Sequence, residues 1–163
     1  MEELVRAAQK GDTLAMSALL DGVSPYVGRI CGPIALEDGE DAAQEALIAV
    51  VRRLGTLREP RALWSWVRVI ATREAVRAAR RRPAVVPSAD APDAVPDRLD
   101  PTVAGDVRDL LSRLDPVQRA VLVLRDVEGL DEASVAELLE IPLGTVKSRL
   151  HRARAAFREE WES

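Results

Sequence analysis

The chain has 163 residues, of which 47% are hydrophobic, 31% charged and 3% aromatic, and its net charge is −4. This composition predicts a folded core and excludes wholesale disorder. It also excludes a transmembrane protein, because apolar runs such as Ala120–Leu124 are far shorter than the ~20 residues that cross a bilayer.

Two single residues limit the possible chemistry. Cys31 is the only cysteine, so no internal disulfide can form, and His151 is the only histidine, too few to build a zinc site with it. The acidic start, residues 1–4, differs from the basic and then apolar start of a secretory signal. We therefore expect a cytoplasmic protein without metal or cofactor.

The N-terminal block begins with three expected helices. Gly11-Asp12 and Gly22 predict two short helices, followed by one around residues 24–34. The next helix, at about residues 38–54, is the most regular. Its apolar positions repeat every 3.6 residues along one side: Ala42, Ala43, Ala46, Leu47, Val50 and Leu54.

A second stripe lies opposite this apolar side and consists of Asp41, Glu45, Ile48 and Arg52. An isoleucine within a charged stripe has no core to enter. The stripe is therefore either a surface for a partner or a charged face with a lone exposed apolar residue, which is common.

A turn over residues 55–59 leads to Pro60, which suits the first turn of a helix because its missing N–H is not needed there. We expect that helix to bury Leu63, Trp66, Val67 and Ile70. Trp64 points about 100° away from Leu63. The helix ends at Arg80–Arg82.

Residues 83–105 contain five prolines and four aspartates and have no helical or alternating period, so they predict a flexible linker. Neither flanking block shows strand signals. The expected fold is all-α, with small helical domains at residues 1–82 and 106–163.

The C-terminal block predicts four helices. The first lies around residues 106–114, and the second, begun by Asp115-Pro116, extends to about residue 127. Asp131 begins the third. A tight turn at residues 140–144 leads to the last, at about residues 143–160. Two short helices joined by such a turn, the second of them basic, predict a helix-turn-helix.

The last helix separates its side chains by type. An apolar stripe is expected to pack on the preceding helices: Val146, Leu150, Ala153, Phe157 and Trp161. Ser148 lies opposite, between His151 and Arg152, with cations to the sides. Residues 147–158 carry five cations and no acid, and residues 61–82 carry seven arginines and one acid. Two such clusters indicate contacts with one polyanion, although either could be a solvated or protein-binding face.

Four segments resemble one family. Residues 141–154, IPLGTVKSRLHRAR, resemble the promoter-reading helix of extracytoplasmic-function (ECF) sigma factors, and residues 114–125 resemble the start of the same domain. Residues 41–45, DAAQE, resemble the D-x-x-Q-E signature of the helix that binds RNA polymerase. Residues 62–71 resemble the following helix, which opens the −10 element.

The resemblance implies a bacterial alternative sigma factor of the sigma-70 family that binds core RNA polymerase and directs transcription from promoters with −10 and −35 elements. It also implies an anti-sigma factor as partner. The residues for core polymerase would be Asp41, Gln44, Glu45, Ile48 and Arg52; those for the −10 element Thr56, Leu57, Arg58, Glu59, Arg61, Trp64 and Arg68; and those for the −35 element Thr145, Lys147, Ser148, Arg149, His151, Arg152, Arg154 and Arg158.

The chain departs from the family pattern at a few positions. Arg73 stands where asparagine is usual, Arg77 replaces a common acid, and Val51 replaces a common tryptophan. Asp131 takes the place of a capping Ser or Thr, a chemically equivalent choice. Arg73 and Arg77 affect which −10 sequence the protein is expected to prefer, and they leave the expected contact with polymerase intact.

Three other functions compete with this interpretation. No Gly-rich phosphate loop and no serine with a plausible base occur in the sequence, so an enzyme is not expected. A helix-turn-helix repressor or activator would dimerise on a palindrome and would not need the stripe that contains Ile48. A sigma-like adaptor would bind polymerase without directing initiation.

Overall fold

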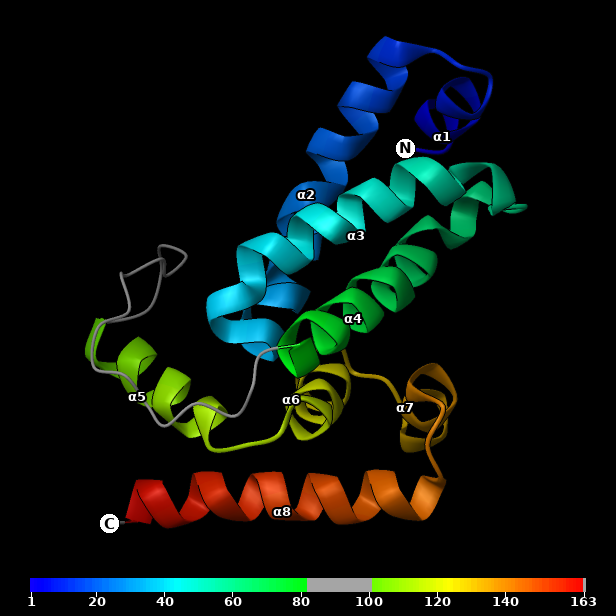
Figure 1. Cartoon of the computed structure of the whole chain (residues 1–163). Coiled ribbons are helices and arrows are strands. Elements are labelled where there is room, and N and C mark those ends of the chain that lie inside the picture. The colour runs from blue at the N-terminus through cyan, green and yellow to red at the C-terminus, as the bar shows by residue number, and fades with distance from the viewer. Residues whose placement is uncertain (82–100, 163) are drawn as a thin grey trace. The chain divides into compact units, whose positions relative to one another are not determined.

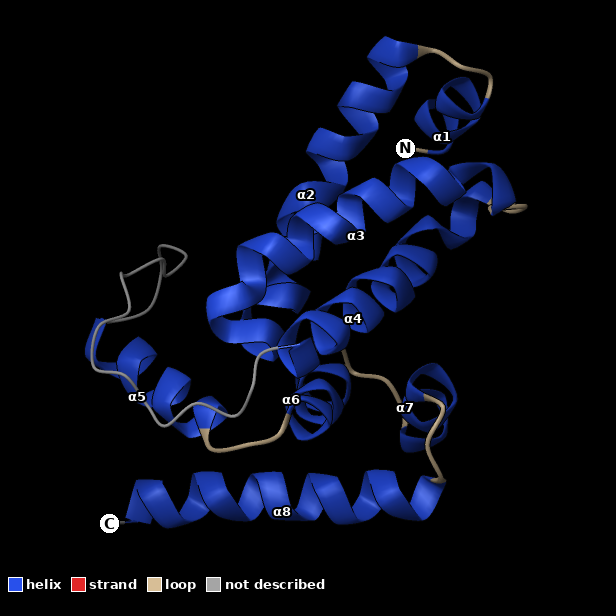
Figure 2. Cartoon of the chain, viewed as in Figure 1, coloured by secondary structure: helices blue, strands red, loops and turns tan. Residues whose placement is uncertain are grey.

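The computed structural model describes residues 1–81 and 101–162. For residues 101–104 it describes the backbone only. Every regular element within these ranges is helical, and no strand occurs in them (Figures 1 and 2). The all-α prediction is confirmed. The chain divides into two compact units, Met1–Ala78 and Ala79–Ser163. Of the expected linker, residues 83–100 lie outside the described residues.

The N-terminal unit is built from α1 (Glu2–Gln9), α2 (Thr13–Ala35), α3 (Gly39–Arg53) and α4 (Leu63–Arg81). Short 3₁₀ turns connect them: η1 (Leu36–Asp38), η2 (Leu54–Thr56) and η3 (Pro60–Ala62). Each long helix contributes apolar side chains to one core, among them the fully buried Leu19, Ile34, Val50 and Leu63. The predicted helix at residues 38–54 is thereby confirmed to within a residue at each end.

α2 is one continuous helix, so the prediction of a break at Gly22 is wrong. Gly22 and Pro25 both lie inside it. A glycine in a helix costs about 1 kcal/mol and a proline about 3 kcal/mol. Burial of each large apolar side chain contributes about 1.5–3 kcal/mol, and the buried stripe continues across the expected break: Leu19, Val23, Val27, Ile30 and Ile34.

The connection from α2 to α3 requires a close backbone approach. Leu36 takes a positive φ of 53° as the chain turns. A Cβ atom on Gly39, the first residue of α3, would lie 3.1 Å from the Cα of Gly32. Glycine at position 39 therefore allows the start of α3 to pack against α2.

The C-terminal unit contains α5 (Pro101–Ser112), α6 (Pro116–Leu122), the π-helical turn η4 (Val123–Val127), α7 (Glu132–Leu139) and α8 (Leu143–Glu162). α5 begins at Pro101 and not near Asp106 as expected. Proline is well suited to that place, because the first helical residue needs no N–H partner. The other predicted helix starts are confirmed.

Candidate nucleic-acid and protein interfaces

The outward face of α3 carries all five residues expected to bind polymerase: Asp41, Gln44, Glu45, Ile48 and Arg52. All are exposed, including 43% of Ile48. The opposite side of α3 buries Ala42, Ala46 and Val50. Val51 is 41% exposed and lies three residues after Ile48, so it extends the apolar part of this face.

Gln9, the last residue of α1, holds the turn between α3 and α4 in place. The Gln9 side-chain amide donates to the carbonyls of Leu54 at 3.0 Å and Leu57 at 2.8 Å. The Thr56 hydroxyl donates to the carbonyl of Arg53 at 2.7 Å. The Glu59 carboxylate accepts the backbone N–H of Arg61 at 3.4 Å. These bonds fix a turn whose polar side chains face outward.

The structure separates the residues that were expected at this turn. Thr56, Arg58, Glu59 and Arg61 are exposed. Leu57, also expected at the −10 element, is only 7% exposed, so its side chain anchors the turn.

The start of α4 exposes Trp64 and buries most of the predicted apolar stripe beside it. Trp64 is 40% exposed, whereas Leu63, Val67 and Ile70 are buried. Trp66, expected to be buried, is only half-buried. The predicted direction of Trp64, away from the core, is therefore confirmed.

Tyr26, the only tyrosine, lies on α2 and supports this surface. Its ring meets Trp64 edge to face with centroids 5.4 Å apart, and its hydroxyl accepts from Arg68 Nε at 3.1 Å. Sequence reasoning missed Tyr26, because no local pattern links residues so distant along the chain.

The helix-turn-helix in the C-terminal unit begins with two well-formed caps. Asp115 and Gln118 form a reciprocal capping box at the start of α6. Asp131 accepts the Ser134 N–H at 2.7 Å, and that bond holds the pKa of Asp131 below its usual value. Glu140 ends α7 with a left-handed φ of 57°, which turns the chain into α8.

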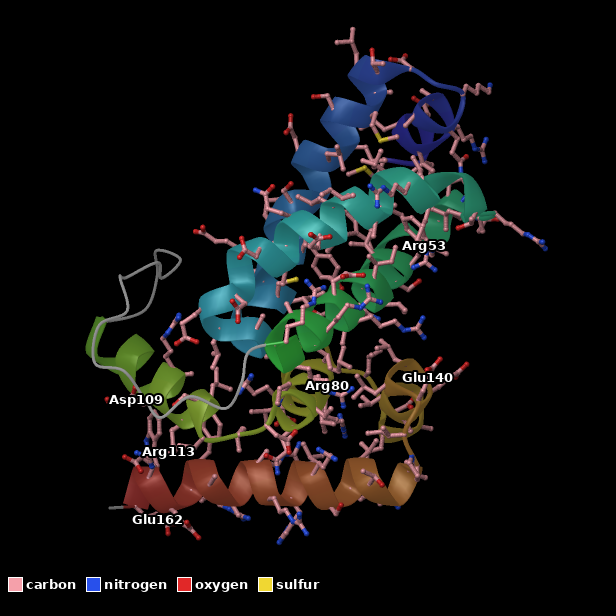
Figure 3. All side chains as sticks on the ribbon, in the orientation of Figure 1. Arg53, Arg80, Asp109, Arg113, Glu140 and Glu162 are labelled. Atoms are coloured by element: carbon pink, nitrogen blue, oxygen red, sulfur yellow. The ribbon has the colours of Figure 1, made fainter. Side chains whose placement is uncertain are left out.

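α8 packs through most of its predicted apolar stripe. Val146, Leu150 and Ala153 are buried and Phe157 is half-buried. The expectation for Trp161 is wrong, since it is 69% exposed. Near this end the helix meets α5 through the Arg113–Glu160 ion pair at 2.9 Å, and Figure 3 shows Arg113 between the two helices.

The opposite face of α8 presents the residues that were expected at the −35 element. Lys147, Ser148, His151, Arg152, Arg154 and Arg158 are exposed, and Thr145 and Arg149 are half-buried. Arg149 donates to both Asp115 carboxylate oxygens at 3.0 and 3.1 Å. Arg154 pairs with Asp126, and this hydrogen bond raises the pKa of Arg154. Such exposed pairs add little stability, so their main effect is on side-chain position.

Neither a metal site nor a membrane span is found within the described ranges. No cluster of three or more His, Cys, Asp or Glu side chains suited to a metal occurs there. None of the helices there combines the length and apolar character that a membrane span requires. Cys31 is buried, and burial raises the pKa of its thiol to about 12.

Comparison with known proteins matches both parts of the chain to regions of one protein family. Residues 19–84 match the model of Sigma-70 region 2, and residues 104–157 match Sigma-70, region 4. The chain is 33% identical over 181 residues to the RNA polymerase sigma-H factor of Pseudomonas aeruginosa, covering 96% of this chain and 91% of that protein. It is 30% identical over 177 residues to the ECF RNA polymerase sigma-E factor of Haemophilus influenzae, covering 94% and 90%. The chain belongs to the ECF sigma factors of the sigma-70 family.

A solved structure shares the fold of this ECF sigma factor. The sigma factor RpoE of Bartonella quintana, solved in complex with the anti-sigma factor NepR, matches with a TM-score of 0.65 and 21% identity, covering 90% of this chain and 96% of that one. Sigma factors bind core RNA polymerase and direct promoter-specific initiation, and they are not enzymes in the catalytic sense. In this ECF sigma factor, region 2 contains α3 and α4, and region 4 contains α8 as far as residue 157.

Proposed function

We propose that this ECF sigma factor binds core RNA polymerase through the exposed face of α3 and reads the −10 and −35 promoter elements through α4 and α8. The observation that carries the proposal is the division of α8 into two faces. Its apolar stripe is buried against the rest of the C-terminal unit, and its cations lie on the outside. Bacterial RNA polymerase and promoter DNA lie in the cytoplasm, so the protein acts there.

The α3 face suits a protein partner. Asp41 and Glu45 supply charge, and Ile48 and Val51 supply exposed apolar area on the same helix. An apolar centre with charged residues beside it is the usual anatomy of a protein interface. The basic partner surface that this arrangement requires would belong to core polymerase.

The turn before α4 and the start of α4 suit single-stranded DNA of the −10 element. Thr56, Arg58 and Glu59 are exposed on a turn fixed by Gln9. In this family a loop at this place captures a flipped-out base. Arg61 and Trp64 follow it, with cationic and aromatic surface for phosphate and base.

α8 suits the major groove of the −35 element. Lys147, Ser148, His151 and Arg152 occupy the face opposite the buried stripe and reach outward. Arg149, Arg154 and Arg158 lie toward the sides, where phosphates border the groove. Asp115 and Asp126 orient two of these arginines before DNA arrives.

The regulatory partner in this proposal is an anti-sigma factor. The similar Bartonella fold was solved with such a protein bound. An inhibitor of this kind would hold the two units together and cover their polymerase and DNA surfaces.

Run-off transcription with purified core polymerase tests the proposal. We expect a promoter-specific transcript that requires the added protein. A repressor or activator would bind DNA alone and give no such transcript, and an adaptor would bind polymerase without directing initiation. Either result would overturn the proposal.

A further inference from the structure

Tyr26, half-buried on α2, connects basic and aromatic side chains from two helices of the N-terminal unit (α2 and α4 in Figure 1). It touches Trp64 edge to face, with the ring planes at 90°. It accepts a hydrogen bond from Arg68 at 3.1 Å. The guanidinium carbon of Arg29 lies 5.9 Å from the centroid of its ring.

This geometry fixes how Trp64 is presented. An edge-to-face contact is a preferred arrangement of two aromatic rings, so it restricts the plane of the indole. The indole still leaves 40% of the residue exposed to a ligand. Tyr26 is therefore placed to orient Trp64 and Arg68 together.

The surroundings of this cluster are basic. On α2, the positions three and four residues from Tyr26 are Gly22, Val23, Arg29 and Ile30; Arg29 is the one charged residue among them. On α4, Arg68 follows Trp64 by one turn. Aromatic surface beside cations is the combination that binds single-stranded nucleic acid, in which bases are free to stack and phosphates lie nearby.

We propose that Tyr26 and Arg29 of α2 complete a nucleotide subsite with Trp64 and Arg68 of α4. Trp64 stacks on one unpaired base of the non-template strand, Tyr26 positions Trp64 and Arg68, and Arg29 contacts an adjacent phosphate. The proposal rests on the proposed function and adds a second helix to its −10 interface.

The experiment uses holoenzyme reconstituted from the full chain and core polymerase, with a single-stranded oligonucleotide that carries the non-template −10 strand of a promoter transcribed by the wild type. An abasic nucleotide is moved along the oligonucleotide one position at a time. The variants are Trp64→Ala, Tyr26→Leu, Tyr26→Phe and Arg29→Ala. Arg6→Ala is the matched control, because Arg6 is another exposed arginine of the same unit.

We expect Trp64→Ala to weaken binding about 5- to 150-fold and Tyr26→Leu about 2- to 12-fold. Both losses should vanish with the abasic nucleotide at one shared position. Tyr26→Phe should retain most of the affinity, because it keeps the ring. Arg29→Ala should lose affinity whichever nucleotide is abasic, and should lower the salt dependence by about 0.7 in log–log slope.

Parallel controls separate the two proposals. Every variant should bind core polymerase and −35 duplex like the wild type, and thermal unfolding should show that Tyr26→Leu is folded. If wild type forms no transcribing holoenzyme, the proposed function fails. If the holoenzyme transcribes but Tyr26→Leu and Arg29→Ala behave like Arg6→Ala, the subsite is wrong. A loss for Tyr26→Leu that persists at every abasic position would also overturn its positioning role.

Discussion

Asp131 shows how one side chain can make the stability of a helix start depend on pH. Its carboxylate accepts the Ser134 N–H, and this bond lowers the pKa of Asp131 from its usual value. A lowered pKa in the folded state means that the carboxylate stabilises the fold above its unfolded pKa, and that this contribution is lost as the pH falls through the folded pKa. The stabilisation is therefore complete at neutral pH.

We expect Asp131→Ala to lower the urea midpoint of the full chain at pH 6, and the difference from wild type to shrink as the pH falls below about 4. Asp131→Asn is the control, since an amide oxygen also caps the helix but does not titrate in this range. Circular dichroism during urea unfolding measures both. An Asp131→Ala deficit that is the same at pH 6 and pH 3.5 would contradict this account.

Residue-scale sequence reasoning was accurate where the cause was local. Asp115 and Asp131 were predicted as caps, and both make the expected bonds, because a cap depends on residues only two or three positions away. Trp161 was misplaced. Periodicity gives the direction of a side chain, but whether another element lies there to bury it depends on the tertiary fold.

At the scale of elements, the packing of α2 against α3 depends on Gly39. A Cβ atom there would crowd the backbone at Gly32, at 3.1 Å, whereas one on Gly28, also inside α2, would meet nothing within 4 Å. We expect Gly39→Ala to destabilise the protein by about 1–3 kcal/mol through overpacking. Gly28→Ala should stabilise it by up to about 1 kcal/mol. Urea unfolding followed by tryptophan fluorescence compares the two, and equal effects would show that the close approach is unimportant.

α8 offers a second test at this scale, because its two kinds of arginine should differ. We expect Arg152→Ala to remove about 1–3 kcal/mol of discrimination between cognate and scrambled −35 duplexes. Arg158→Ala should weaken both duplexes alike and reduce the salt dependence. Titration of both variants on both duplexes at two salt concentrations measures this. If Arg152→Ala proves indifferent to sequence, the helix is docked in another register.

The extent of α2 shows why elements are harder to predict than caps. Gly22 predicted a break, and both Gly22 and Pro25 lower the stability of a helix that contains them. The helix continues because its buried stripe extends across both residues, and that burial depends on the elements packed against α2. α3 was predicted almost to the residue, because it contains no such conflict.

For the whole molecule, the net charge of −4 conceals surfaces of different character. The α3 face is acidic and apolar, and α8 presents cations outward. They belong to different units, so polymerase binding and −35 recognition should be separable by mutation.

Reversal of Asp41 and Glu45 to lysine tests this separation. We expect the double variant to bind core polymerase about 100-fold or more weakly, because like charges then meet across the interface. Its affinity for the −35 duplex should not fall, since its added positive charge can only favour DNA. Asp21→Lys with Glu3→Lys is the control: both acids are exposed outside α3, and the change in net charge is the same. Fluorescence anisotropy with labelled protein measures core binding, and a gel-shift titration measures duplex binding. Equal losses of core binding in the two double variants would reduce the α3 effect to net charge, and normal core affinity after reversal would exclude this face as the polymerase contact.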